Sequence, residues 1–174
     1  MLNQDQYATY RAASGVFTPG ATPQDVFTIT GNTNTNVYVQ KMGLSTLQST
    51  AGLNIWLITK RSSANAGGTS AAVTAVPVQS GNAAAQATVL QYTANPTAGT
   101  LIGNVWSGFV NAAATATAGV GSDLIELDFE SMFGQPIALL NAAEVLGWNF
   151  SGGALPSGLI VLPWVQWFEI PKSP

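Results

Sequence analysis

Residues 25–44 read DVFTITGNTNTNVYVQKMGL, two apolar runs separated by a cluster of glycine, asparagine and threonine. In the first run, Phe27 and Ile29 fall on one face of an extended chain. The other face carries Val26, Thr28 and Thr30. Residues 31–36 are types that favour a turn, and residues 37–44 follow as a second apolar run. The segment therefore predicts two β-strands joined by a turn.

Short apolar runs bounded by turn residues recur along the rest of the chain. Many such strands in 174 residues favour a single domain with two packed sheets, and the jelly roll is a common solution. The expected fold class is all-β, a single jelly-roll-like antiparallel β-sandwich. Pro77 cannot donate to a β-ladder, so the strand that contains it is expected at a sheet edge or to end there. The further strands are expected at residues 54–61, 69–78, 87–92, 101–111, 124–130, 137–140, 143–149 and 159–170.

Residues 1–24 are interpreted as an N-terminal arm and residues 25–174 as the sandwich domain. The arm is expected to be extended or to form a short helical turn, in which Asn3 caps a segment that runs through Tyr10 and Ala13. Aromatic side chains in an arm need a surface to pack on, either in this domain or in a neighbouring subunit. The arm's aromatic anchors are Tyr7, Tyr10 and Phe17.

Composition excludes most of the usual catalytic chemistry. Only 7% of the residues are charged, and residues 62–122 carry no charge at all, whereas soluble domains average about 25% charged residues. The chain has no histidine to titrate near neutral pH and no cysteine to form a thiolate, a disulfide or a zinc cluster. These absences favour a protein that is not an enzyme and that uses no cofactor.

Charge and hydropathy also bear on the possible partners. The net charge is −3, and the only pair of adjacent basic residues is Lys60–Arg61. We therefore expect no binding to nucleic acid. The longest apolar run, residues 159–165, is far shorter than the roughly 18 residues that a membrane span needs. The polar start of the chain has no leader pattern, so no membrane association is expected.

Residues 123–130, DLIELDFE, are the strongest candidate for a polar site. On a strand, Glu126, Asp128 and Glu130 would share one face at separations of roughly 6.5–7 Å, which lies near the spacing of an inverting glycosidase pair. Calcium binding is a second possibility, although no loop has the usual ligand pattern. A third is an electrostatic contact with Lys60 and Arg61, or with a basic partner protein. The interpretation that we favour is the solvent-facing side of an antiparallel strand.

The last expected strand is apolar on both faces, although the outer face of an antiparallel sandwich is normally polar. Either the arm or another subunit must therefore cover it. We expect a contact between subunits, with simple internal burial as the alternative. The candidate interface residues are Tyr7, Tyr10, Phe17, Trp164, Trp167 and Phe168. The five tryptophans of the chain could instead stack on sugars or pack in the core.

Short pieces in a fixed order also carry a resemblance. They are KRSS at 60–63, GGT at 67–69, AVTAVP at 72–77, YTANPT at 92–97, GQPI at 134–137 and EVL at 144–146, with Asn149 after them. In this order they resemble small virion proteins of tailed bacteriophages and prophages, over about residues 24–169. The chain departs from that group at residues 77–79 and in its tryptophan-rich C-terminal part. The group offers no catalytic residue to carry over.

The resemblance implies a β-sandwich component of a virion. The expected function is that of a capsid cement or decoration protein on the capsid surface. Its partners would be the major capsid protein and copies of itself, as a dimer or trimer. The alternative is a tail or spike subunit that binds a host surface glycan. A glycan hydrolase is the third possibility, and it would require two outward carboxylates to line a cleft.

Overall fold

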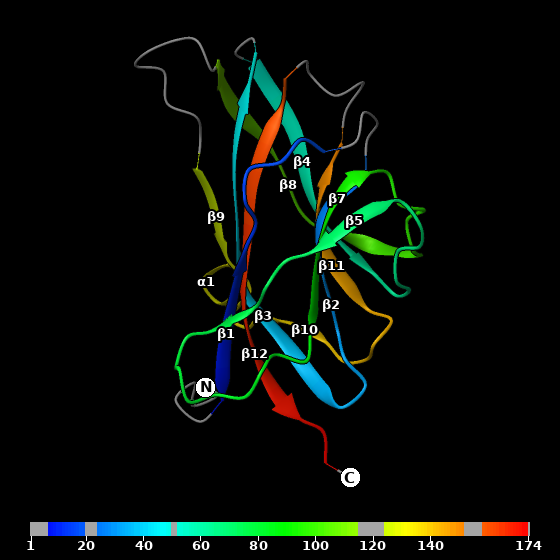
Figure 1. Ribbon diagram of the computed structural model, residues 1–174, viewed down its shortest axis with the longest axis vertical. Helices are drawn as coiled ribbons and strands as arrows, with labels where there is room; N and C mark the ends of the chain where they lie inside the picture. Colours follow the sequence, from blue (N-terminus) through cyan, green and yellow to red (C-terminus); the bar gives the residue numbers. More distant parts are fainter. Residues whose placement is uncertain (1–6, 20–23, 50–51, 115–123, 152–157, 174) are drawn as a thin grey trace.

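A computed structural model of the chain describes residues 7–19, 24–49, 52–114, 124–151 and 158–173 (Figure 1). Its elements are β1 (Ala8–Ala13), β2 (Gln24–Thr30), β3 (Thr35–Gln48), β4 (Gly52–Arg61), β5 (Thr69–Ala72), β6 (Val76–Pro77), β7 (Thr88–Ala94), β8 (Leu101–Ala114), β9 (Leu124–Asp128), α1 (Phe129–Phe133), β10 (Ile137–Leu139), β11 (Val145–Phe150) and β12 (Ile160–Pro171). The predicted all-β fold is confirmed, and most of the predicted strands lie within a few residues of their expected positions.

Two antiparallel sheets pack face to face. Sheet A contains β1, β12, β3 and β9 in that order, and sheet B contains β2, β11, β4 and β8. Among these principal strands of the described residues, the first in the chain pairs with the last, the second with the seventh, the third with the sixth and the fourth with the fifth. This is the pairing of a long hairpin rolled into a sandwich, which is the jelly roll.

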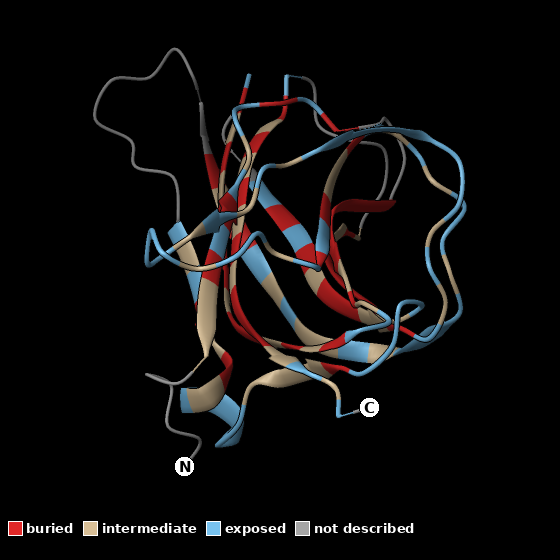
Figure 2. Ribbon diagram, turned by 60° about the horizontal axis from the view of Figure 1, so that its bottom comes forward, coloured by how far each residue is buried: buried red, intermediate tan, exposed pale blue. Residues whose placement is uncertain are grey.

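The core lies between the sheets, where the alternation of the strands places every second side chain. On β4, Trp56 and Ile58 are fully buried, whereas Leu53 and Ile55 on the opposite face are exposed. Trp56 meets Trp148 of β11 edge to face, with ring centroids 6.4 Å apart. Figure 2 shows the buried positions gathered on the strands of the sandwich, where they alternate with exposed ones, and the outlying loops mostly exposed.

Residues 62–100, between β4 and β8, form an insertion in the eight-stranded framework. The insertion adds β7 and then β5 to the edge of sheet B next to β2, and it adds β6 to the edge of sheet A next to β1. In Figure 1 this green segment runs from β5 across to β6 and back to β7. Pro77 lies in the terminal strand of sheet A, so its predicted place at an edge is confirmed.

The N-terminal segment is extended rather than helical. Residues 8–13 form β1, which pairs with residues 164–169 of β12 along its whole length. Farther on, Phe17 forms an isolated bridge with Val161. The expected helical turn through Tyr10 and Ala13 is therefore wrong, because this segment completes sheet A. Asn3, the expected cap, lies outside the described residues.

The acidic strand ends earlier than predicted. β9 stops at Asp128, and a short helix, α1, begins at Phe129. The Asp128 side chain accepts a hydrogen bond from Ser131 N, and Gly134, with φ of 74°, ends the helix in the left-handed conformation. Glu130 therefore lies in the first turn of a helix, not on the strand face that Glu126 and Asp128 share. No helix in the described part of the chain has the length and apolar character needed to cross a membrane.

Candidate interaction surface

Most of the arm and β12 aromatics pack within the subunit. Tyr10 stacks on Trp167 and Tyr7 on Phe168, with ring centroids 5.7 and 5.8 Å apart. Trp167 has no exposed surface, and Tyr10, Phe17 and Phe168 are also buried. The cover that β12 requires is therefore supplied by the arm of the same chain. Side chains with so little exposed area cannot form much of a contact between subunits.

Trp164 is only partly buried, but it is not an open platform for a sugar. Its indole lies against Gly43 of β3, where an added Cβ would lie 2.1 Å from the indole nitrogen. The guanidinium carbon of Arg11 stands 4.0 Å from the ring centroid, in a cation–π contact that occupies one face of the ring. The three tryptophans Trp56, Trp148 and Trp167 are fully buried.

The carboxylates of β9 share a cation that was not predicted. Lys41 Nζ of β3 lies 3.0 Å from Asp128 Oδ2 and 3.4 Å from Glu126 Oε1. The backbone hydrogen bond from Ser131, together with Lys41, lowers the pKa of Asp128, and the hydrogen bond to Asp128 raises the pKa of Lys41. Both carboxylates thus form an ion pair at the surface, and Asp128 also caps α1.

Lys60 and Arg61 do not pair with the acidic strand of their own chain. Lys60 Nζ donates to the Ala138 carbonyl oxygen at 2.8 Å. Arg61 is buried and donates two hydrogen bonds to the Asp25 carboxylate of β2, from Nε at 2.6 Å and from Nη2 at 2.9 Å. The predicted contact of Lys60 and Arg61 with the acidic strand of the same subunit is therefore wrong. Lys41 forms the ion pairs with that strand, and Arg61 binds the carboxylate of Asp25, 36 residues away in sequence.

Asp25 is the centre of a buried polar network. Its carboxylate also accepts hydrogen bonds from Asn65 at 2.8 Å and Asn149 at 2.7 Å. Burial alone would raise the pKa of Asp25, but the hydrogen bonds from Arg61 and the two amides, with the charge of Arg61, hold it below the usual value. Arg61 Nη1 donates in addition to the Gly99 carbonyl oxygen. The network thus ties both ends of the insertion to sheet B.

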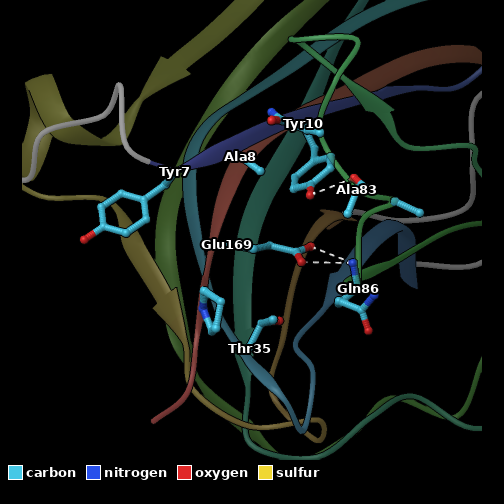
Figure 3. Close-up of a pocket in the computed structure, with 10 residues that line it drawn as sticks. Tyr7, Ala8, Tyr10, Thr35, Ala83, Gln86 and Glu169 are labelled. Carbon is cyan, nitrogen blue, oxygen red and sulfur yellow. Dashed lines mark hydrogen bonds between the residues drawn. The ribbon is translucent and has the colours of Figure 1, made fainter.

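A second buried carboxylate borders a hollow of about 400 Å³ beside the arm (Figure 3). Glu169 accepts hydrogen bonds from the backbone N–H groups of Gln86 and Ala87 and from the Trp167 indole, at 2.9 to 3.0 Å. Tyr10 donates its hydroxyl proton to the Ala83 carbonyl oxygen at 3.0 Å. Burial, followed by the charge of Glu169, raises the pKa of Tyr10. These polar groups hold residues 83–87 of the insertion against β1 and β12.

A strip of uncharged and mostly apolar side chains, several of them exposed, covers part of the outer face of sheet B. We call it the β4–β8 surface, and its residues are Leu53, Ile55, Leu57, Ser107, Phe109 and Asn111. Leu53 and Phe109 expose 68% and 66% of their surface, and Ile55 exposes 41%. Ile55 and Phe109 are direct cross-strand neighbours. All six residues are uncharged, so partner binding here would remove apolar surface from water without a cost for desolvating charge.

The described residues bring no metal site together. Within them, no group of three or more histidine, cysteine, aspartate or glutamate side chains is placed to hold an ion. Comparison with known proteins finds no significant match to any protein-family model, any curated protein or any solved structure. The resemblance to tailed-phage virion proteins therefore stays a prediction, and the fold is assigned from the strand pairing alone.

The β4–β8 surface was missed at the level of sequence, although a signal for it exists. In NIWLITKR, residues 54–61, both faces of the strand are apolar, because Ile55 and Leu57 alternate with Trp56 and Ile58. The doubly apolar pattern was given weight only in β12, where the cover is internal. The Asp25 network has no local signal, because its members come from three strands and a loop.

Proposed function

We propose that the protein is a non-enzymatic structural component of a tailed-phage particle. It acts as a cement or decoration protein that binds the outer capsid shell in many copies. Its contacts with the major capsid protein and with other copies of itself are apolar and neutral rather than electrostatic. The observation that carries the proposal is the uncharged β4–β8 surface, exposed on the outer face of a jelly roll, a fold that viral capsid domains commonly use.

The basic side chains support an apolar mode of association, because all of them have partners within the chain. Lys41 pairs with β9, Lys60 with a carbonyl oxygen and Arg61 with Asp25. Arg11 covers Trp164, and Lys172 donates to the carbonyl oxygens of residues 32 and 33. A partner that recognised this chain through strong positive charge would find few free groups. Contacts without charge also hold over a wide range of salt concentrations.

The experiment that tests the role is a measurement of copy number in native particles. The chain is quantified against the major shell protein by mass spectrometry of purified particles. A cement protein should be present in numbers comparable to the shell protein, on the order of hundreds of copies, because it repeats with the shell symmetry. A dozen or fewer copies would move the protein to the tail or spike. Its absence from particles would contradict a virion role altogether.

A binding experiment tests the surface. Particles stripped of the protein are mixed with purified wild-type chain, with Phe109→Lys or with Val78→Lys. Val78 exposes 62% of its surface, close to the 66% of Phe109, but it lies beyond the β4–β8 surface. The Phe109→Lys variant should lose binding, because the lysine charge must be desolvated in an apolar contact. The Val78→Lys variant should bind like the wild type. Equal binding by both variants would remove the β4–β8 surface from the proposal.

A further inference from the structure

The β4–β8 surface ends at a sheet edge that, in the described residues, is paired with another strand only at one end. Residues 101–110 of β8 pair with β4 on one side, and in the described part of the chain no strand pairs with their other side. Only the end of β8, residues 113–114, meets β3. About half of the backbone N–H and C=O groups along an edge strand point away from the sheet. Such a row of unpaired groups is a template for another strand.

The other edges of the described sandwich carry the features that normally block such pairing. β6 has two residues, one of them Pro77, and β5 has four. β9 has five residues, two of which are the charged Glu126 and Asp128, and β10 has three residues. β8 has 14 residues and no charged side chain. Short length, proline, charge and β-bulges are the usual ways to protect an edge. In β8 only the bulges are present, and they are confined to the part of the strand before Trp106.

We propose that two copies of the chain pair through β8, edge to edge and antiparallel across a two-fold axis. The inference rests on the β4–β8 surface of the proposed function and names its partner as a second copy. Across a two-fold axis the β8 strand of one copy lies against the β8 strand of the other. A charged side chain near the axis would therefore lie close to the same charge in the second copy. The absence of charge from the whole of β8 makes this edge complementary to itself.

The regular part of β8 is long enough for this pairing. From Trp106 to Ala112 the register with residues 52–58 of β4 has no bulge, whereas the irregularities lie nearer Leu101. Pairing along residues 106–110 of this part joins the two B sheets into one continuous sheet. It also brings the two Phe109 side chains and the neighbouring β4 side chains, Leu53 and Ile55, onto one shared outer face. Hydrogen bonds between the backbones and cross-strand packing of the β8 side chains, Phe109 above all, then act together.

The oligomeric state of the purified chain is the first test, measured without particles by sedimentation over a range of concentrations. The wild type should form a dimer. Phe109→Lys should weaken the dimer at least tenfold, because each dimer then holds two lysines near the axis. Ser107→Lys gives the same test at an exposed polar position on the same strand. Val78→Lys is the matched control and should leave the dimer unchanged. Far-ultraviolet circular dichroism confirms that each variant is folded.

Spin labels on single cysteines then test the geometry, because the natural chain has no cysteine. Labels are placed one at a time at Asn104, Ser107 and Asn111, with Val78 as the distant control. In an antiparallel pair, the distance between like labels grows by about 7 Å for each residue away from the two-fold axis. The three β8 positions should follow that rule, and labels at Val78 should lie farther apart than any of them.

The outcomes separate this inference from the proposed function. A chain that is monomeric at all concentrations, or a dimer whose β8 distances do not follow the rule, overturns the pairing. If such a chain still binds particles in many copies, the cement function stands without it. Conversely, a β8 dimer that is absent from particles supports the pairing and contradicts the virion role. Loss of the dimer in Val78→Lys, but not in Phe109→Lys, would place the contact at the β1–β6 edge.

Discussion

The two sides of the sandwich, where the sheet edges meet, differ in how they are closed. On one side the edges are β1 and β2, and the insertion covers both by adding β6 to one and β7 to the other. Side chains of the insertion such as Val73, Ala75 and Ala85 pack against the core. On the other side the edges are β8 and β9, and in the described residues no such cover lies over β8. The chain therefore completes one side by itself and leaves the other available to a partner.

Charge is also divided between the two sides. On the covered side, the carboxylates of Asp25 and Glu169 are buried and act as clamps that hold the insertion to the sandwich. On the open side, Lys41 forms ion pairs with both Glu126 and Asp128 along the β9 edge and so offsets part of their negative charge. The β8 edge is left without charge. In a chain with few charges, most of them fix the fold of the subunit, and the surface left for association is neutral.

The largest expected effect comes from breaking the stronger clamp. Asp25→Ala leaves the Arg61 guanidinium buried without its partner, which typically costs about 3–5 kcal/mol of unfolding free energy. It also leaves the amides of Asn65 and Asn149 without their acceptor. The unfolding free energy is measured by urea denaturation. Glu126→Gln is the control, because that exposed pair with Lys41 should contribute about 0–1 kcal/mol. Equal losses in the two variants would contradict the clamp.

The same carboxyl predicts how stability depends on pH. The pKa of Asp25 is lower in the folded chain than in the unfolded chain, since Arg61 and the amides outweigh the effect of burial. Its contribution is therefore complete above the unfolded pKa of about 3.9 and is lost as the pH falls through the lower, folded pKa. Asp25→Asn should show a smaller acid-induced loss of unfolding free energy than the wild type. Parallel pH profiles for the two proteins would show that Asp25 is not the group responsible.

The second clamp is expected to be weaker. In Glu169→Gln the charge is lost and an amide N–H₂ group replaces one acceptor oxygen. Hydrogen bonds to charged groups contribute about 1.5–3 kcal/mol, and the loss should appear mainly as local opening of residues 79–87. Limited proteolysis with elastase should cleave this segment faster in the variant. Glu144→Gln is the control, because Glu144 accepts a backbone N–H from Leu140 in a different loop. Faster cleavage of residues 79–87 in the control as well would argue against a local clamp.

The strands could be predicted because their signal is local. Alternation and turn residues placed most of them and indicated a jelly-roll-like sandwich. The errors arise where a local feature was overlooked or a distant contact decides the structure. Asp128 and Gly134 are a helix cap and a helix stop, and this signal was present in the sequence but was not used. By contrast, β1 is extended because it pairs with β12, more than 150 residues later in the chain.

The polar partners were the least predictable part of the molecule. The distribution of charge along the sequence suggested Lys60 and Arg61, the one pair of adjacent cations, or a basic partner protein as the contact of the acidic strand. In the fold, β3 lies beside β9, so Lys41 is the cation opposite Asp128. Arg61 and Asp25 meet because β11 lies between β4 and β2, and Asn149 on β11 bridges to the same carboxylate. Such neighbours follow from sheet order, which alternation along one strand does not reveal.

The smallest expected effect on stability separates the two faces of a single strand. Ile58→Val removes a methylene group from the core of β4 and should cost about 0.5–1.5 kcal/mol of unfolding free energy. Ile55→Val makes the same chemical change on the exposed face and should change the unfolding free energy of the monomer by less than about 0.5 kcal/mol. In the dimer Ile55 supports its cross-strand neighbour Phe109, which packs near the two-fold axis, whereas Ile58 lies on the opposite face of β4. Sedimentation of both variants should therefore show weaker association only for Ile55→Val. If the two variants change stability and association alike, the outer face of β4 has the same role as its core face. The β8 and β9 side of the sandwich would then not differ from the β1 and β2 side in its availability to a partner.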